Sequence, residues 1–235
     1  MLTKQDLANL TADGSFSSLP ARVAKRRILR PDEAAAAIRN GIVRAARDCE
    51  RWGGEWPTDR GCENLLQVRA AEELHEQMAS LGLGWLTLEQ PLATIIDEGT
   101  AKLGRPHAGL SPQKRADIAI WNKADQIYGV VEIKRAERDR DWQSDLEKLA
   151  RILARYSRSH KNYIRYCILG VFISQRCSEL VNERGKSLEK IAATIANRFE
   201  LKHSTIFDMD NIHHWDGGGA DDWICGAATV VLSHG

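Results

Sequence analysis

Apolar side chains recur along the chain with two different periods. A spacing of three or four residues predicts helices, which we expect over residues 31–53, 63–80, 142–158 and 187–199. Alternating or continuous apolar runs predict strands over 84–95 with a break at Pro91, in both arms of 114–135, over 163–173 and over 223–233. The order of these elements predicts a mixed sheet flanked by helices, an α/β (α+β) fold.

The predicted hairpin KRADIAIWNKADQIYGVVEIKR, residues 114–135, carries three charged side chains within its apolar pattern. Side chains alternate along a strand, so Asp117 lies on the face opposite to the isoleucines of its own strand. Glu132 and Lys134 likewise share one face of the second strand. One face of the hairpin is therefore predicted to pack in a core, while the other brings charges together.

The register of this hairpin determines which charges meet. If Trp121 pairs with Tyr128, then Asp117 lies opposite Glu132. A shift by two residues would change its partner but not its face. Opposed side chains in a sheet have Cβ atoms roughly 5 Å apart, so two carboxylates in this position repel each other. A cation is needed to compensate them.

Either Lys134 or a divalent metal would supply that cation. Carboxylate oxygens are the ligands that Mg²⁺ prefers. Two carboxylates with a nearby lysine are also the groups needed to bind a metal and activate a water molecule for attack on a phosphate. The alternative is a strand at the surface with an ordinary Glu132–Lys134 ion pair, because such a triplet is common by chance.

The sequence RAD at 115–117 followed by VEIK at 131–134 resembles the two-part motif of the PD-(D/E)XK nuclease superfamily, with alanine in place of the motif's proline. The order of elements over residues 60–175 is similar to that family's core. The resemblance implies a restriction-endonuclease-like core with helices on both faces of the sheet. Residues 1–58 would then form an N-terminal helical extension, and residues 59–235 the nuclease-like domain.

The resemblance also implies an activity, namely Mg²⁺-dependent hydrolysis of phosphodiester bonds, with Mn²⁺ as a substitute metal. Asp117 and Glu132 would bind the metal, and Lys134 would position or activate the attacking water. The substrate implied is DNA, with RNA as an alternative, and the cleavage would be endonucleolytic or exonucleolytic. Restriction or anti-phage defence is the setting that the resemblance implies for a small protein of this kind.

A glutamate from the helix before the hairpin often joins the metal site in this family. Glu63 is our candidate for that glutamate, as both metal ligand and catalytic residue, and Glu72 and Glu73 are the alternatives. A second function also fits the resemblance: a catalytically inactive, nuclease-fold subunit that binds nucleic acid or assembles a larger complex. The presence of Asp117, Glu132 and Lys134 together favours the enzyme.

The predicted helix after the hairpin belongs to a basic stretch, since no Asp or Glu occurs from Lys148 to Ser178. Four cations recur in this helix at helical spacing: Lys148, Arg151, Arg155 and Arg158. Basic side chains beside the active site would contact the phosphate backbone of DNA. The alternative is a helix face that is simply solvated.

The composition of the chain fits a globular protein of one domain with or without an extension, with 43% hydrophobic and 28% charged residues over 235 positions. Five cysteines without a CxxC pair predict reduced thiols rather than disulfides. No signal peptide or membrane span is expected, so the predicted location is the cytoplasm. A homodimer or a partner subunit would dock on the N-terminal helices.

Overall fold

The computed structural model describes residues 28–53, 63–98, 110–135, 139–156, 164–175, 177–207, 213–215 and 223–235. Its centre is a seven-stranded sheet in which the strands follow the order β1-β2-β3-β4-β7-β5, with β6 paired to β7. These strands are β1 Trp85–Pro91, β2 Arg115–Trp121, β3 Ile127–Arg135, β4 Tyr166–Gln175, β5 Lys202–Phe207, β6 His213–Trp215 and β7 Trp223–Ser233.

The sheet is mixed because β3 and β4 run parallel while the other pairs of strands are antiparallel. A parallel pair needs a crossover connection, and helix α6 (Asp139–Tyr156) provides it between β3 and β4. The other described helices are α2 (Pro31–Gly53), α4 (Glu63–Ser80), α5 (Leu92–Glu98) and α7 (Ser178–Arg198).

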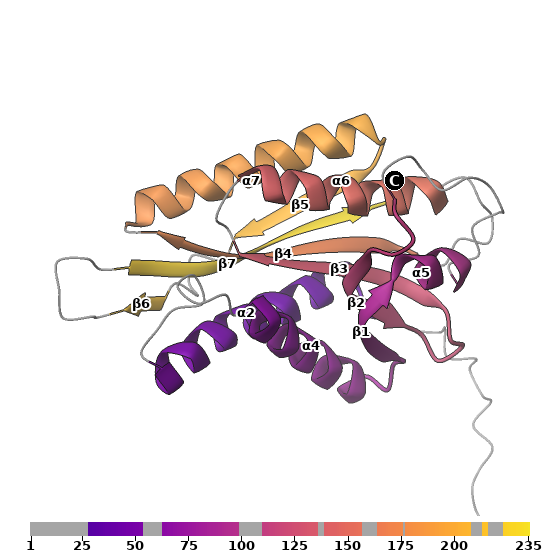
Figure 1. Cartoon of the computed structure of the whole chain (residues 1–235), viewed down its shortest axis with the longest axis horizontal. Helices are drawn as coiled ribbons and strands as arrows, with labels where there is room; N and C mark the ends of the chain where they lie inside the picture. The colour runs from indigo at the N-terminus through magenta and orange to yellow at the C-terminus, as the bar shows by residue number, and fades with distance from the viewer. Residues whose placement is uncertain are drawn as a thin grey trace, which may run out of the picture.

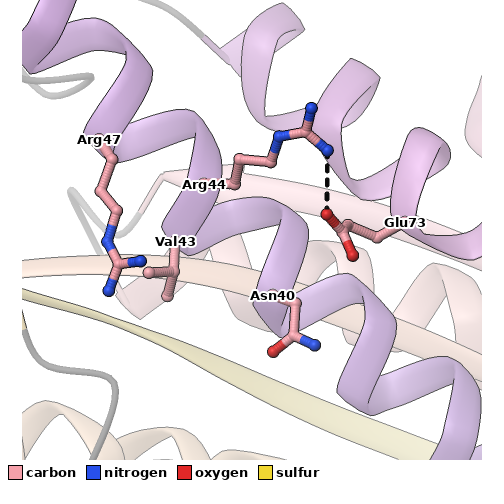
Figure 2. A pocket seen from close by; sticks show the side chains of 5 residues that line it. All are labelled: Asn40, Val43, Arg44, Arg47 and Glu73. Atoms are coloured by element: carbon pink, nitrogen blue, oxygen red, sulfur yellow. Dashed lines mark hydrogen bonds and ion pairs between the residues drawn. The ribbon is translucent and has the colours of Figure 1, made fainter.

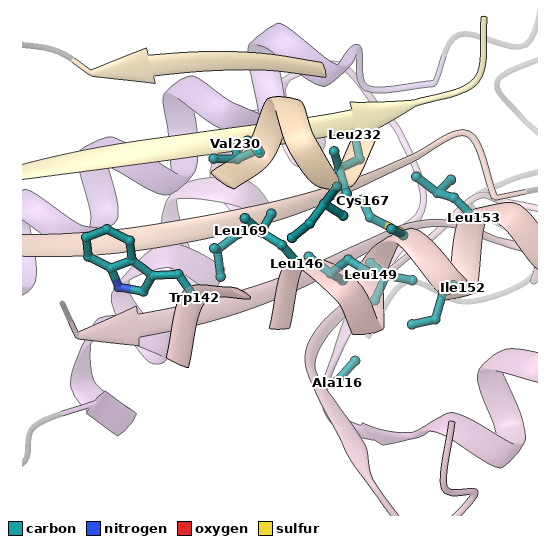
Figure 3. Close-up of a cluster of buried hydrophobic side chains, with 14 of the residues drawn as sticks. Ala116, Trp142, Leu146, Leu149, Ile152, Leu153, Cys167, Leu169, Val230 and Leu232 are labelled. Atoms are coloured by element: carbon teal, nitrogen blue, oxygen red, sulfur yellow. The ribbon is translucent and has the colours of Figure 1, made fainter. Parts of the chain in front are cut away.

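Helices cover both faces of the sheet, with α2 and α4 on one side and α6 and α7 on the other (Figure 1). Alternation in β2 and β3 divides their side chains between two cores. Ile118 and Val131 pack toward α2 and α4, whereas Ala119 and Val130 pack toward α6 and α7. Figure 3 shows the second core, in which Leu146 and Leu149 of α6 pack with Cys167 and Leu169 of β4.

Helix α2 belongs to the first core and packs closely on α4. Ile38 and Ile42 are completely buried in the same cluster as Leu66 of α4 and Val131 of β3. The helices approach so closely at Gly41 that a Cβ atom there would lie 2.5 Å from the Cα atom of Ala70. The boundary expected between an extension and a domain, at residues 58 and 59, lies outside the described residues.

The predicted mixed sheet with flanking helices is confirmed, and the bounds of α2, α4 and β7 agree with the expected ranges. Four details were wrong. The strand expected to resume after Pro91 is replaced by helix α5, and helix α7 begins at Ser178 instead of residue 187. Strands β5 and β6 were not expected. None of the helices in the described part of the chain combines the length and apolar character needed to cross a membrane.

Candidate active site

The charged residues of the hairpin lie where β2 and β3 separate. The paired register of these strands ends at Ile118 and Val131. Beyond this point β2 continues beside β1 as far as Arg115, and β3 continues beside β4 as far as Arg135. Asp117 is the residue before Ile118, and Glu132 is the residue after Val131. Both therefore lie at the point where the two strands separate.

The expected pairing of Trp121 with Tyr128 was wrong. A β-bulge between Ile120 and Trp121 makes Trp121 pair with Ile127 instead. The pairing of Ile118 with Val131 nevertheless follows the register that was expected to bring Asp117 to Glu132. The bulge changes the register only near the turn. The carboxylates of Asp117 and Glu132 still lie close enough for the charge of Asp117 to raise the pKa of Glu132.

Glu132 is a carboxylate almost without solvent contact, since its exposed fraction is 1%. Its Oε2 atom lies 2.7 Å from the Nζ atom of Lys148 on α6. Its Oε1 atom is buried and accepts no hydrogen bond from the described residues. Burial, reinforced by the negative charge of Asp117, raises the pKa of Glu132 to about 8, against the opposing influence of Lys148.

Asp117 is fixed by a backbone group of the neighbouring strand. The N–H of Ile133 donates a hydrogen bond of 2.6 Å to its Oδ2 atom. Burial raises the pKa of Asp117, although this hydrogen bond and the charges of Lys134 and Lys148 act in the opposite direction. Both carboxylates are therefore harder to ionise than usual, chiefly because they are buried.

Lys134 forms an ion pair with Glu63, the first residue of α4, and the Nζ and Oε1 atoms are 2.6 Å apart. Burial would lower the pKa of Lys134, but the hydrogen bond and charge of Glu63, together with Asp145 and Asp117, raise it above its usual value. Lys134 is therefore a protonated lysine held at the edge of the carboxylate pair.

The two alternative glutamates of α4 point elsewhere. Glu72 lies 2.6 Å from Arg69, and Glu73 lies 3.1 Å from Arg44 of α2. Arg44 and Glu73 line a surface pocket of about 260 Å³ together with Asn40, Val43 and Arg47, and Figure 2 shows the ion pair between them. Of the three glutamates considered, Glu63 is thus the one placed beside Lys134.

Three of the four cations expected to contact DNA lie on the described part of α6. Lys148 points into the site, where it contacts Glu132 and also lies 3.3 Å from Asp145. Arg151 forms an ion pair of 3.0 Å with Glu147, and Arg155 is half-buried. Arg158 lies outside the described residues.

Lys148 is therefore a residue of the site, although the sequence pattern assigned it to DNA contact. Helical spacing alone does not reveal this role. Trp142, Leu146 and Leu149 define the buried stripe of α6, and Lys148 lies at its edge.

The site combines the carboxylates of Asp117, Glu132 and Glu63 with the ammonium groups of Lys134 and Lys148. Within the described ranges, no three His, Cys, Asp or Glu side chains are arranged to hold a metal ion. Glu132 Oε1 nevertheless accepts no hydrogen bond from the described residues, and a nearby cation would offset the burial that raises the pKa values of Glu132 and Asp117. The carboxylates therefore fit a hard divalent cation such as Mg²⁺.

The raised pKa of Glu132 predicts a pH-dependent stability. The folded protein binds a proton at Glu132 up to about pH 8, while the unfolded chain releases it near the usual glutamate pKa. The free energy of unfolding should therefore fall as the pH rises between these two values, and Glu132→Gln should make this slope smaller. Urea unfolding at several pH values without divalent metal measures it. Equal slopes in the two proteins would contradict the assignment.

Comparison with models of protein families, with curated proteins and with solved structures gave no significant match.

Proposed function

We propose that the protein is a metal-dependent nuclease of the PD-(D/E)XK type, which hydrolyses phosphodiester bonds in DNA. One observation carries the proposal: Asp117, Glu132 and Lys134 lie with Glu63 where β2 and β3 separate. Three elements supply these residues, and the sequence order is that of the RAD and VEIK motif. Structural ion pairs explain Lys134 and Glu63, but they do not explain two adjacent, partly uncompensated carboxylates.

Asp117 and Glu132 would hold Mg²⁺, with Mn²⁺ as a substitute, and Glu63 would complete the site. The chemistry that the metal supplies when bound is polarisation of a phosphoryl oxygen and a lower pKa for a water ligand. Asp117 is suited to this role because the Ile133 N–H fixes the direction of its carboxylate. Glu132 offers its Oε1 atom, which accepts no hydrogen bond from the described residues.

The two lysines would have different tasks in this mechanism. Lys134 stays protonated, because Glu63 and the other carboxylates raise its pKa. It would therefore orient the attacking water and stabilise the negative charge that develops on the phosphate, instead of removing a proton. Lys148 would keep Glu132 oriented through its ion pair on the α6 side of the sheet. Glu63 would in turn hold the ammonium group of Lys134 in position.

The direct test is cleavage of nucleic acid by the full chain. With Mg²⁺ or Mn²⁺, we expect cleavage of at least one of supercoiled plasmid, linear duplex DNA and single-stranded DNA, and we expect EDTA to stop it. Conversion of plasmid to nicked or linear products would indicate endonucleolytic attack, and an RNA substrate tests the alternative polymer. Binding without cleavage under every metal would contradict the enzyme and favour a nucleic-acid-binding or assembly subunit.

A further inference from the structure

Glu89 has an unusual backbone conformation for a residue within a strand. Its φ angle is 52°, in the left-handed region that strains any residue except glycine. Two other non-glycine residues of the described chain share this conformation, Asp125 and Glu200. Asp125 lies in the turn between β2 and β3, and Glu200 follows the C-terminus of α7, where such angles are common. Glu89 has neither explanation.

The pairing of β1 with β2 is interrupted at this residue. Leu88 pairs with Ile118 and Gln90 pairs with Ala116, so Glu89 lies across from Asp117 without pairing to it. The register is the same on both sides of the interruption, so no residue has been inserted as in a β-bulge. The strain is therefore local to Glu89, beside the proposed metal ligand.

A buried side chain connects the two interrupted positions. Gln67 of α4 is 7% exposed, and its Nε2 atom donates a hydrogen bond of 3.0 Å to Glu89 Oε1. The same Nε2 atom donates one of 2.7 Å to the main-chain oxygen of Asp117. An amide nitrogen has two hydrogens, so Gln67 can satisfy both acceptors at once.

We propose that Gln67 and Glu89 are positioning residues that hold Asp117 in the orientation needed to bind a divalent metal ion. This inference rests on the proposed function, because it assigns Asp117 to the metal. Asp117 is anchored at two points, its main-chain oxygen by Gln67 and its carboxylate by the N–H of Ile133. Glu89 adopts a strained backbone to direct its own carboxylate at the Gln67 amide and so fixes the direction of that amide.

Helix α4 then acts on the site through two side chains one turn apart. Glu63 holds Lys134, and Gln67 holds Asp117. Partners that orient metal ligands typically change metal affinity by about 10- to 100-fold when they are removed. Loss of Gln67 or Glu89 should therefore weaken metal binding without removing a metal ligand.

The test measures Mn²⁺ affinity of the full chain by electron paramagnetic resonance, without DNA, together with the thermal midpoint. Gln67→Met removes the donor at nearly constant volume, and Glu89→Gly removes the carboxylate while tolerating the left-handed backbone. We expect both to weaken Mn²⁺ binding about tenfold. Glu89→Gln keeps an acceptor oxygen and should stay near the wild-type affinity.

Two matched controls separate positioning from stability. Glu200→Gly relieves a left-handed φ angle at the end of α7 and should raise the midpoint by about 2 °C, whereas in Glu89→Gly the lost hydrogen bond to Gln67 offsets that gain. Only Glu89→Gly should weaken Mn²⁺ binding. Gln77→Met repeats the change of Gln67→Met near the other end of α4 and should leave Mn²⁺ affinity unaltered.

The outcomes distinguish this inference from the proposed function. Wild-type affinity in both Glu89→Gly and Gln67→Met would overturn the positioning role and leave the nuclease proposal intact. If Gln67→Met does not fold, Glu89→Gly alone decides. A wild-type chain that neither binds Mn²⁺ nor cleaves DNA would overturn the proposed function and this inference with it.

Discussion

Glu132→Gln should reduce Mg²⁺-dependent DNA cleavage on the order of a thousandfold, while the protein remains folded. Glutamine keeps the shape of the side chain and removes its negative charge. The protein loses a proposed metal ligand at the most buried point of the site, where the exposed fraction of Glu132 is 1%. Initial rates of plasmid cleavage with matched protein concentrations measure the loss, and circular dichroism checks the fold.

Glu147→Gln is the matched control for this prediction. Glu147 of α6, like Glu132, forms ion pairs with basic side chains, but its partners are Arg151 and Arg198, outside the proposed site. Its cleavage rate should equal that of the wild type. Asp117→Asn and Lys134→Met should behave like Glu132→Gln. Cleavage that persists in all three variants, or that EDTA does not stop, would show that the catalytic centre lies elsewhere.

Lys148→Met should destabilise the folded protein by about 3 kcal/mol at pH 9. At this pH Glu132 is ionised, because its pKa is raised to about 8, and the substitution leaves a buried carboxylate without its ammonium partner. The loss should be smaller at pH 5.5, where a protonated Glu132 does not need a cation. Urea unfolding at both pH values in the absence of divalent metal measures the difference.

A double variant separates this charge effect from loss of packing. Glu132→Gln combined with Lys148→Met removes both partners and should recover most of the stability lost at pH 9, because no uncompensated charge remains. Lys190→Met, on an exposed position of α7, controls for the loss of a surface lysine. An equal loss at both pH values without recovery in the double variant would mean that Lys148 acts through packing alone.

The parts of the fold with strong local signals were predictable from the sequence. Pro31 at the start of α2 and the glycines at its end set its limits, and the periodic apolar residues of α4 did the same. The first half of α7 lacks such a signal, because Val181 is its one fully buried apolar residue before Leu188. The start of α7 was therefore predicted nine residues too late, at residue 187 instead of Ser178.

The positions of the site residues were predictable where strand alternation determines them. They were not predictable where the packing of helices determines them. Alternation alone places Asp117, Glu132 and Lys134 together at the end of the hairpin. The choice of Glu63 over Glu72 and Glu73 depends on how α4 lies against α2, which no local pattern records. The inward direction of Lys148 depends likewise on the packing of α6.

The close contact of α2 with α4 at Gly41 has a consequence for the minimal unit of the protein. Ile38 and Ile42 belong to the same core as Val131, the neighbour of Glu132. A chain shortened to residues 59–235 would expose that side of the sheet to water and leave α4, which carries Glu63 and Gln67, without its neighbour. We therefore expect a chain without residues 1–58 to aggregate instead of forming a smaller folded protein.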